Sequence, residues 1–189
     1  MWPWEHLVFG YVWYSVLHRI AWGRPISDAE GLALALGAQA PDLVDKTLSW
    51  TLGVVSSGYG PAHSVLIGLP VAALVAGALW TRNRARVAAA FILAYGSHLV
   101  GDALALRANG PNLGRLLWPV VTFDAYETRL GFVERFATYF VSFVARMTNP
   151  ENLALVLGYA AVFACVAVLW VLDGTPGIRR VRRFVDADR

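Results

Sequence analysis

His98 and Asp102 lie four residues apart inside an otherwise apolar run from Val87 to Leu106. Because residues i and i+4 share one face of a helix, both side chains are predicted to point to the same place. An ionisable side chain at membrane depth is costly, and both residue types ligate metal ions. The pair therefore indicates a metal site, with a buried hydrogen-bonded pair that holds helices together as the alternative.

Three further residues of ligand type are expected at a similar depth: His6, Asp42 and His63. Imidazole and carboxylate groups suit zinc, iron, manganese and nickel, so the ligand types alone do not choose the metal. We expect a divalent metal, with Zn²⁺ as the first choice, bound as one ion or as two ions that share an aspartate. Taken singly, His6 and His63 could be ordinary interfacial or capping residues, and Asp42 after Pro41 could be a helix N-cap.

The composition indicates the class of fold that must position these residues. The chain has 189 residues, of which 57% are hydrophobic and 15% are charged, and its mean hydropathy is +0.51. Soluble domains carry roughly 25% charged residues. We therefore predict an all-α integral membrane protein, a helical bundle with about five membrane-embedded helices plus interfacial helices. One membrane-embedded domain is expected over residues 1–176, with a basic cytoplasmic tail over 177–189.

The expected helices are apolar runs bounded by glycine, proline and charged residues. Five of these runs are predicted to be embedded in the membrane: Phe9 to Trp22, Gly31 to Ala40, Ala62 to Trp80, Val87 to Leu106 and Asn152 to Leu172. Leu43 to Val55 is expected as a short helix near the interface. Leu130 to Met147 is aromatic and amphipathic, so it could lie in the interface or make a partial crossing.

Arginine placement predicts the orientation in the cell membrane. Arginines cluster in the loop 82–86 and in the tail at 179–183, and Arg19 and Arg24 flank the first loop. The positive-inside rule assigns all three regions to the cytoplasm, which places the five candidate ligands on the extracytoplasmic side. The net charge is only +3, so no nucleic-acid partner is expected, and the hydrophobic composition makes membrane lipids the expected partners.

Nearby polar residues are assigned less direct roles. His18 follows His6 by twelve residues, about 18 Å along the same helix, and is excluded from the site. Glu5 could support His6 or be a plain interfacial charge. Asp45 could join the site or contact Lys46.

Five short motifs follow one another along the first two thirds of the chain. They are Glu5-His6-Leu7-Val8-Phe9-Gly10, Ala40-Pro41-Asp42-Leu43, Ala62-His63-Ser64, Ser97-His98-Leu99-Val100-Gly101-Asp102 and Leu116-Leu117-Trp118-Pro119. In this order they resemble the prokaryotic inner-membrane family described as metal-dependent hydrolases and as LexA-binding, membrane-associated proteins. That family is in turn similar to zinc-dependent phospholipase C and to related single-strand nucleases.

The resemblance implies a role for each matching residue. His98 and Asp102 would correspond to a helix of metal ligands with the pattern His-x-x-x-Asp. Asp42 and His63 would complete the cluster, and His6 would correspond to an early histidine ligand. The implied substrate is a phosphoester, such as a phospholipid or a lipid-linked compound.

Two positions depart from the family pattern. Gly58 stands where a histidine is usual, and Val44 stands where the second aspartate of Pro-Asp-Leu-Asp is usual, so one or two ions are expected rather than three. We predict a membrane-bound metal-dependent hydrolase in which metal-activated water attacks a phosphoester and Asp42 is the general base. Two other functions fit the same residues: a non-catalytic scaffold or stress-response protein with a structural metal or polar cluster, and a small cation or proton transporter.

Overall fold

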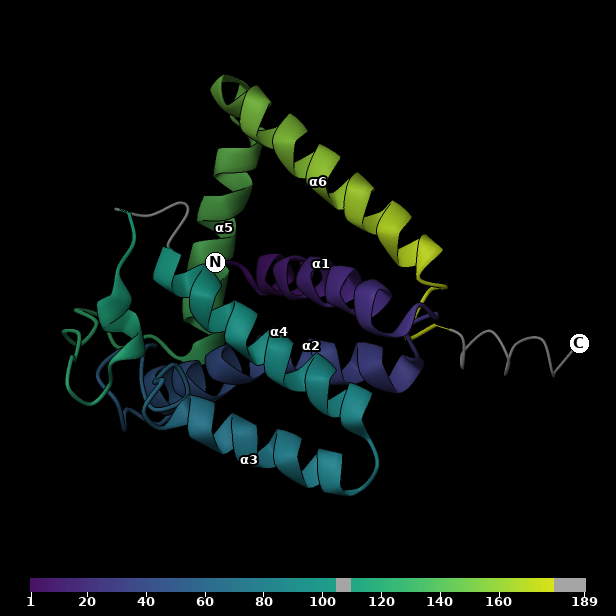
Figure 1. Cartoon of the computed structure of the whole chain (residues 1–189). Helices are drawn as coiled ribbons and strands as arrows, with labels where there is room; N and C mark the ends of the chain where they lie inside the picture. The colour runs from purple at the N-terminus through teal and green to yellow at the C-terminus, as the bar shows by residue number, and fades with distance from the viewer. Residues whose placement is uncertain (105–109, 179–189) are drawn as a thin grey trace, which may run out of the picture.

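The computed structural model describes residues 1–104 and 110–178, and these residues form helices and loops with no strand. Four long helices make up a bundle: α1 (Pro3–Trp22), α2 (Asp28–Lys46), α3 (Gly68–Thr81) and α4 (Ala85–Leu104). α4 contacts each of the other three helices, so it forms the centre of the bundle (Figure 1). The predicted all-α fold is confirmed over the described residues.

Two further helices lie outside this bundle. α5 (Phe132–Thr148) stands at the end of the bundle where the chain begins, and α6 (Leu153–Leu172) runs back diagonally toward the other end (Figure 1). Short helical turns at Thr47–Thr51, Leu113–Leu116 and Pro150–Asn152 join these elements. The basic tail predicted for the chain lies outside the described residues from position 179 onward.

Two helical segments among the described residues are long and apolar enough to cross a membrane. They are Ala85–Leu104 and Pro150–Leu172. α3 is also apolar but has 14 residues, fewer than the ~20 that a bilayer requires. α1 and α2 carry buried histidine and carboxylate side chains, which lower their hydropathy. The expected number of about five membrane-embedded helices is therefore not confirmed.

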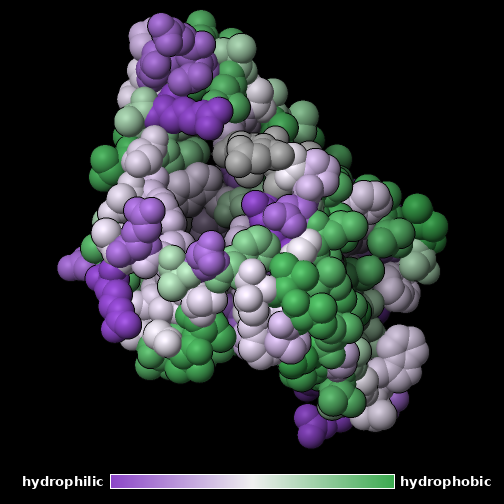
Figure 2. All heavy atoms as spheres, turned by 90° about the vertical axis from the view of Figure 1, so that its left-hand side faces the viewer, coloured by the Kyte–Doolittle hydropathy of each residue, from purple (hydrophilic) through white to green (hydrophobic). Residues whose placement is uncertain are grey.

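The interior of the bundle is rich in small and polar residues, and many large apolar side chains lie outside. Ala38, Ala90 and Ala94 are fully buried, whereas Ile20 and Leu74 are more than 70% exposed. Small residues allow helix backbones to approach closely, as is common between helices in membranes. Figure 2 shows the end of the molecule seen from the left of Figure 1, where hydrophobic and hydrophilic patches alternate around a central hollow.

Gly37 marks the closest approach between α2 and α4. A Cβ atom at this position would lie 2.3 Å from the backbone oxygen of Phe91, so only glycine fits there. This contact explains a helix boundary that the sequence predicts wrongly. The sequence predicts that the helix stops at Ala40, but α2 continues through Pro41 to Lys46. Packing of α2 against α4 outweighs the backbone hydrogen bond that Pro41 cannot make.

The starts of α1 and α3 differ most from the prediction. α1 begins at Pro3 rather than Phe9, because proline suits the first turn of a helix and the Glu5 carboxylate accepts the N–H of Trp2. α3 begins at Gly68 rather than Ala62. The segment before it is held as a turn by the bonds to Asp45 described below.

Candidate metal centre

Four buried side chains from three separate segments converge on one point. Asp42 comes from α2, His63 from the loop before α3, and His98 and Asp102 from one face of α4. One donor atom from each of the four lies within 4.8 Å of all the others. None of the four residues is more than 5% exposed, so they form a closed cluster inside the bundle.

The donor atoms are spaced as ligands of one small ion would be. The Nε2 atoms of His63 and His98 are 3.1 Å apart. Asp102 Oδ2 lies 3.3 Å from the Nε2 of His63 and 3.6 Å from that of His98. Asp42 Oδ1 lies 3.5 and 3.7 Å from the same two atoms. A tetrahedral zinc site with bonds of 2.0–2.1 Å has ligand atoms about 3.3 Å apart. These five distances are close to that value, and all the donor atoms lie within 4.8 Å of one another.

Hydrogen bonds on the far side of both rings orient the two imidazoles. The Nδ1 of His98 lies 2.7 Å from the backbone oxygen of Ala38, which can only accept, so this nitrogen donates. The Nδ1 of His63 lies 2.8 Å from Asp45 Oδ2. In the neutral rings, both Nε2 lone pairs therefore face the shared point. Partners of this kind fix the tautomer of metal-ligating histidines in general.

Asp45 holds the loop that carries His63. Its carboxylate accepts the backbone N–H groups of Gly60, Ala62 and His63, each at 2.9 Å, in addition to the His63 ring. The two sequence-based alternatives for Asp45 are thereby decided, since it supports the site and Lys46 instead pairs with Asp42 at 2.5 Å. The spacing Asp42-x-x-Asp45 places both carboxylates one helical turn apart, which is the sequence signal for this role.

The cluster strongly favours positive charge at His63. Burial by itself lowers the pKa of His63, but hydrogen bonds with Asp102, Asp42 and Asp45 outweigh burial and raise the pKa to about 10. A cation at the shared point would meet the same negative surroundings as the proton on this ring. The electrostatics of the site are therefore those of a cation site.

His6 lies beside the four-residue cluster rather than within it. Its ring stacks on that of His98 with centroids 3.6 Å apart, and its Nε2 lies 3.3 Å from Asp102 Oδ1. The N-terminal ammonium of Met1 donates to the same oxygen at 3.0 Å. The ring is fully buried, and neither nitrogen has a hydrogen bond of good geometry among the described residues. His18 is far from the site and lies near Glu30, in agreement with its exclusion.

A second loop closes the cluster from the side of α4. Arg115 donates to the backbone oxygen of Asp102 at 2.8 Å. The hydroxyl of Ser64, next to His63, donates to the backbone oxygen of Trp118 at 2.5 Å. The Leu116-Leu117-Trp118-Pro119 motif therefore contacts the segment that carries His63.

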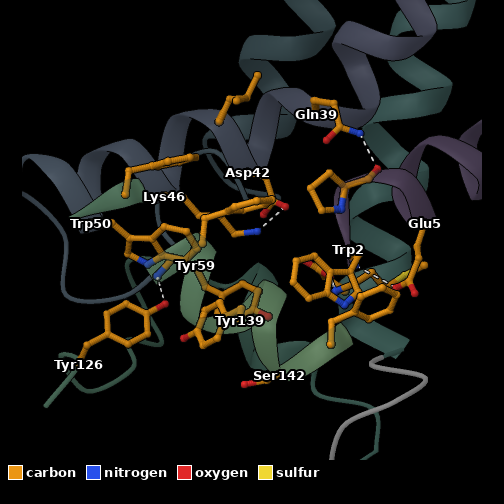
Figure 3. A pocket seen from close by; sticks show the side chains of 18 of the residues that line it. Trp2, Glu5, Gln39, Asp42, Lys46, Trp50, Tyr59, Tyr126, Tyr139 and Ser142 are labelled. Atoms are coloured by element: carbon orange, nitrogen blue, oxygen red, sulfur yellow. Dashed lines mark hydrogen bonds and ion pairs between the residues drawn. The ribbon is translucent and has the colours of Figure 1, made fainter. Parts of the chain in front are cut away.

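A pocket of about 660 Å³ opens beside the cluster and is lined by both Asp42 and Asp102. Figure 3 shows Asp42 and Lys46 between Trp50 on one side and Trp2 on the other. The far wall is an aromatic face of α5, formed by Phe132, Phe136, Tyr139 and Phe143. Sequence reasoning missed Lys46, Trp50 and this wall. The α5 aromatic residues recur at helical spacing, which indicates an aromatic helix face but not what that face packs against.

The two positions that depart from the expected motif, Gly58 and Val44, lie in different surroundings. Gly58 lines the pocket, and its backbone N–H donates to the hydroxyl of Tyr126 at 3.2 Å. Val44 is 46% exposed on α2 and does not line the site. The carboxylate one residue later, Asp45, is the one that reaches His63.

Comparison with known proteins supports membrane association. Residues 1–175 match the family model described as YdjM inner membrane protein. No curated protein and no solved structure matches the chain.

Proposed function

We propose that this chain, which belongs to the YdjM inner membrane protein family, is a membrane-bound hydrolase that uses a divalent metal, with Zn²⁺ as the first choice. Asp42, His63, His98 and Asp102 are the proposed ligands. The observation that carries the proposal is the convergence of four donor atoms within 4.8 Å of one another. Two imidazoles and two carboxylates form a donor set that suits zinc.

His6 is proposed as a ligand for a second ion. Its Nε2 and Asp102 Oδ1 lie 3.3 Å apart, and neither ring nitrogen is used in a hydrogen bond of good geometry. Asp102 would then be shared between the two ions, and the second ion would replace the N-terminal ammonium of Met1 beside it. With the ion in the four-residue cluster, the total would be two ions, within the one or two that the sequence predicts.

The pocket beside the cluster supports hydrolysis of a phosphoester such as a phospholipid or lipid-linked substrate. A bound divalent ion would lower the pKa of a water molecule toward neutrality and so supply a nucleophile. Lys46 and Arg146 provide positive charge within the pocket, and the α5 aromatic residues provide an apolar wall. Asp42 lines the pocket as well as the cluster. When His63, His98 and Asp102 hold the ion, Asp42 is the spare carboxylate and the proposed general base for the attacking water.

Turnover of phosphodiesters by the zinc-loaded protein tests this proposal. The probes are bis(p-nitrophenyl) phosphate and a fluorescent phospholipid, each compared with the chelator-treated protein. Asp42→Asn is expected to lower hydrolysis by about a hundredfold through loss of the base, while Asp124→Asn in an exposed loop leaves it unchanged. Lys46→Gln is expected to raise KM. A wild-type protein that retains metal and cleaves neither probe would contradict catalysis.

The closure of the site favours a second candidate function. All four candidate ligands are buried and their donor atoms gather at one point. Structural zinc sites are closed and fully ligated by protein, whereas catalytic sites keep one position open. Retained metal without turnover would support a non-catalytic membrane scaffold that is held together by a structural metal.

We also propose a multi-pass arrangement with the metal centre on the extracytoplasmic side and the tail in the cytoplasm. The arginine-rich loop before α4 supports this orientation through the positive-inside rule. In a Cys165→Ala background, a membrane-impermeant maleimide applied to intact cells, with the outer membrane permeabilised where one is present, should label Asp124→Cys and not Arg82→Cys. The reverse pattern would invert the orientation.

A further inference from the structure

α6 is attached to the rest of the described chain near its two ends. Near its start, the Tyr159 hydroxyl donates to the Glu5 carboxylate. Just after its end, the Asp173 carboxylate accepts from the Tyr11 and Ser15 hydroxyls, each at 2.7 Å, and from Arg19 at 2.5 Å. The body of α6 is apolar, and none of its residues is buried. Figure 1 shows it running diagonally past α1.

A groove of about 1090 Å³ lies between α6 and the bundle. One wall is the face of α6 that carries Phe163, Val166, Ala167 and Trp170. The opposite wall comes from the apolar residues of α1 and α2, including Leu7, Val8, Leu32, Leu34 and Ala35. Water in such a groove would face apolar surface on both sides, so hydrocarbon is the favoured content.

The length of the groove suits one leaflet of a bilayer. Phe163 to Trp170 spans about 10 Å along α6 at 1.5 Å per residue. One leaflet contributes about 15 Å of the hydrocarbon core. Since Pro150–Leu172 is long and apolar enough to cross a membrane, the groove is open to acyl chains from the surrounding lipid.

The charged residues at one end of the groove indicate the headgroup. Arg84, in the loop between α3 and α4, lines this end, and its side chain is exposed. Asp28 also lines it, but one of its oxygens accepts the backbone N–H of Gly177 at 2.8 Å. A guanidinium group recognises a phosphate through paired hydrogen bonds, and basic residues next to helices of this kind attract anionic lipids.

We propose that this groove binds one anionic phospholipid, with an acyl chain between α6 and the bundle and its phosphate at Arg84. The lipid comes from the leaflet that contains the loop between α3 and α4. It fills the space that α6 leaves open and holds the helix in place. This site is separate from the metal centre and does not depend on the proposed hydrolase activity.

Native mass spectrometry of the full-length protein tests the headgroup contact. The detergent-purified protein is titrated with phosphatidylglycerol or phosphatidylcholine, and one phosphatidylglycerol per chain should bind preferentially. Arg84→Glu should weaken this binding about tenfold. Arg82→Glu changes the same charge in the same loop but does not line the groove, so it should bind as the wild type does. Equal affinity for both lipids, or equal loss in both variants, would overturn the proposal.

A second pair of variants tests the acyl-chain contact. Ala167→Trp fills the groove and should reduce lipid retention, whereas Ala161→Trp, on a part of α6 that does not line the groove, should not. A circular dichroism spectrum in detergent that matches the wild type would show that Ala167→Trp still folds. If Ala167→Trp retains the lipid as the wild type does, or if it abolishes a dimer rather than a lipid complex, the groove does not hold this ligand.

Discussion

The Nε2 atoms of His63 and His98 lie 3.1 Å apart, while the Nδ1 of each ring faces an oxygen on the far side. This arrangement directs both Nε2 atoms at one point, which one oxygen each of Asp42 and Asp102 also faces. Buried lone pairs that face one another are costly unless a positive charge lies between them. The cluster is therefore built around a cation, either a metal ion or a proton on His63.

Asp45→Asn should weaken metal binding without removing a ligand. Asp45 orients the His63 ring and holds three backbone N–H groups of its loop. Loss of such a supporting carboxylate lowers metal affinity about 10–100-fold in other sites. A competition titration with a chromophoric chelator measures the change. Asp124→Asn, in an exposed loop, is the matched control. Equal metal affinities in the two variants would show that Asp45 does not support metal binding.

Metal binding should release a proton from His63 at neutral pH. Its pKa of about 10 lies above the usual 6.5, so the ring is charged at pH 7 before the metal binds. Metal and proton then compete for the same Nε2 atom, and affinity should rise up to about tenfold per pH unit between pH 7 and 9. Calorimetry in buffers of different ionisation enthalpy counts the protons released. Binding that releases no proton at pH 7 would contradict a neutral His63 ligand.

The same pKa predicts how the chelated protein responds to pH. Because the folded-state pKa of His63 is raised, its stabilising contribution is fully present below about pH 6.5 and is lost as the pH rises toward 10. Thermal unfolding of the chelated protein in detergent should therefore show a lower Tm at pH 9.5 than at pH 7. His63→Gln should flatten this dependence of Tm on pH. If Tm falls with pH as steeply in this variant as in the wild type, the dependence comes from other groups.

Gly37→Ala should destabilise the fold and the metal centre together. The added Cβ would lie 2.3 Å from the backbone oxygen of Phe91, which forces α2 and α4 apart at a cost of about 1–3 kcal/mol. These two helices carry Asp42, His98 and Asp102. Gly77→Ala on α3 meets no atom within 4 Å and should be neutral or stabilising. Equal melting temperatures for the two variants would show that this contact is not tight.

The central part of the site could be predicted from local sequence, because helical spacing alone places His98 and Asp102 on one face. Asp42 and His63 could be added to the site only by assuming that the helix ends carrying them lie on the same side of the membrane. The structure brings both residues to the same point as His98 and Asp102. The stop predicted at Pro41 was wrong, because packing against α4 outweighs the missing hydrogen bond. The pocket was not predictable, because it depends on how α5 lies against the end of the bundle, and residue spacing within α5 does not reveal that.

Metal content of the purified protein tests the central claim most directly. Inductively coupled plasma mass spectrometry of the wild type should find at least about one divalent ion per chain, with zinc foremost. His98→Ala combined with Asp102→Ala should reduce this content to about a tenth or less, whereas His18→Ala, far from the site, should retain it. Circular dichroism in detergent shows whether each variant keeps its helices. Equal and negligible metal in the wild type and the folded double variant would contradict the metal centre.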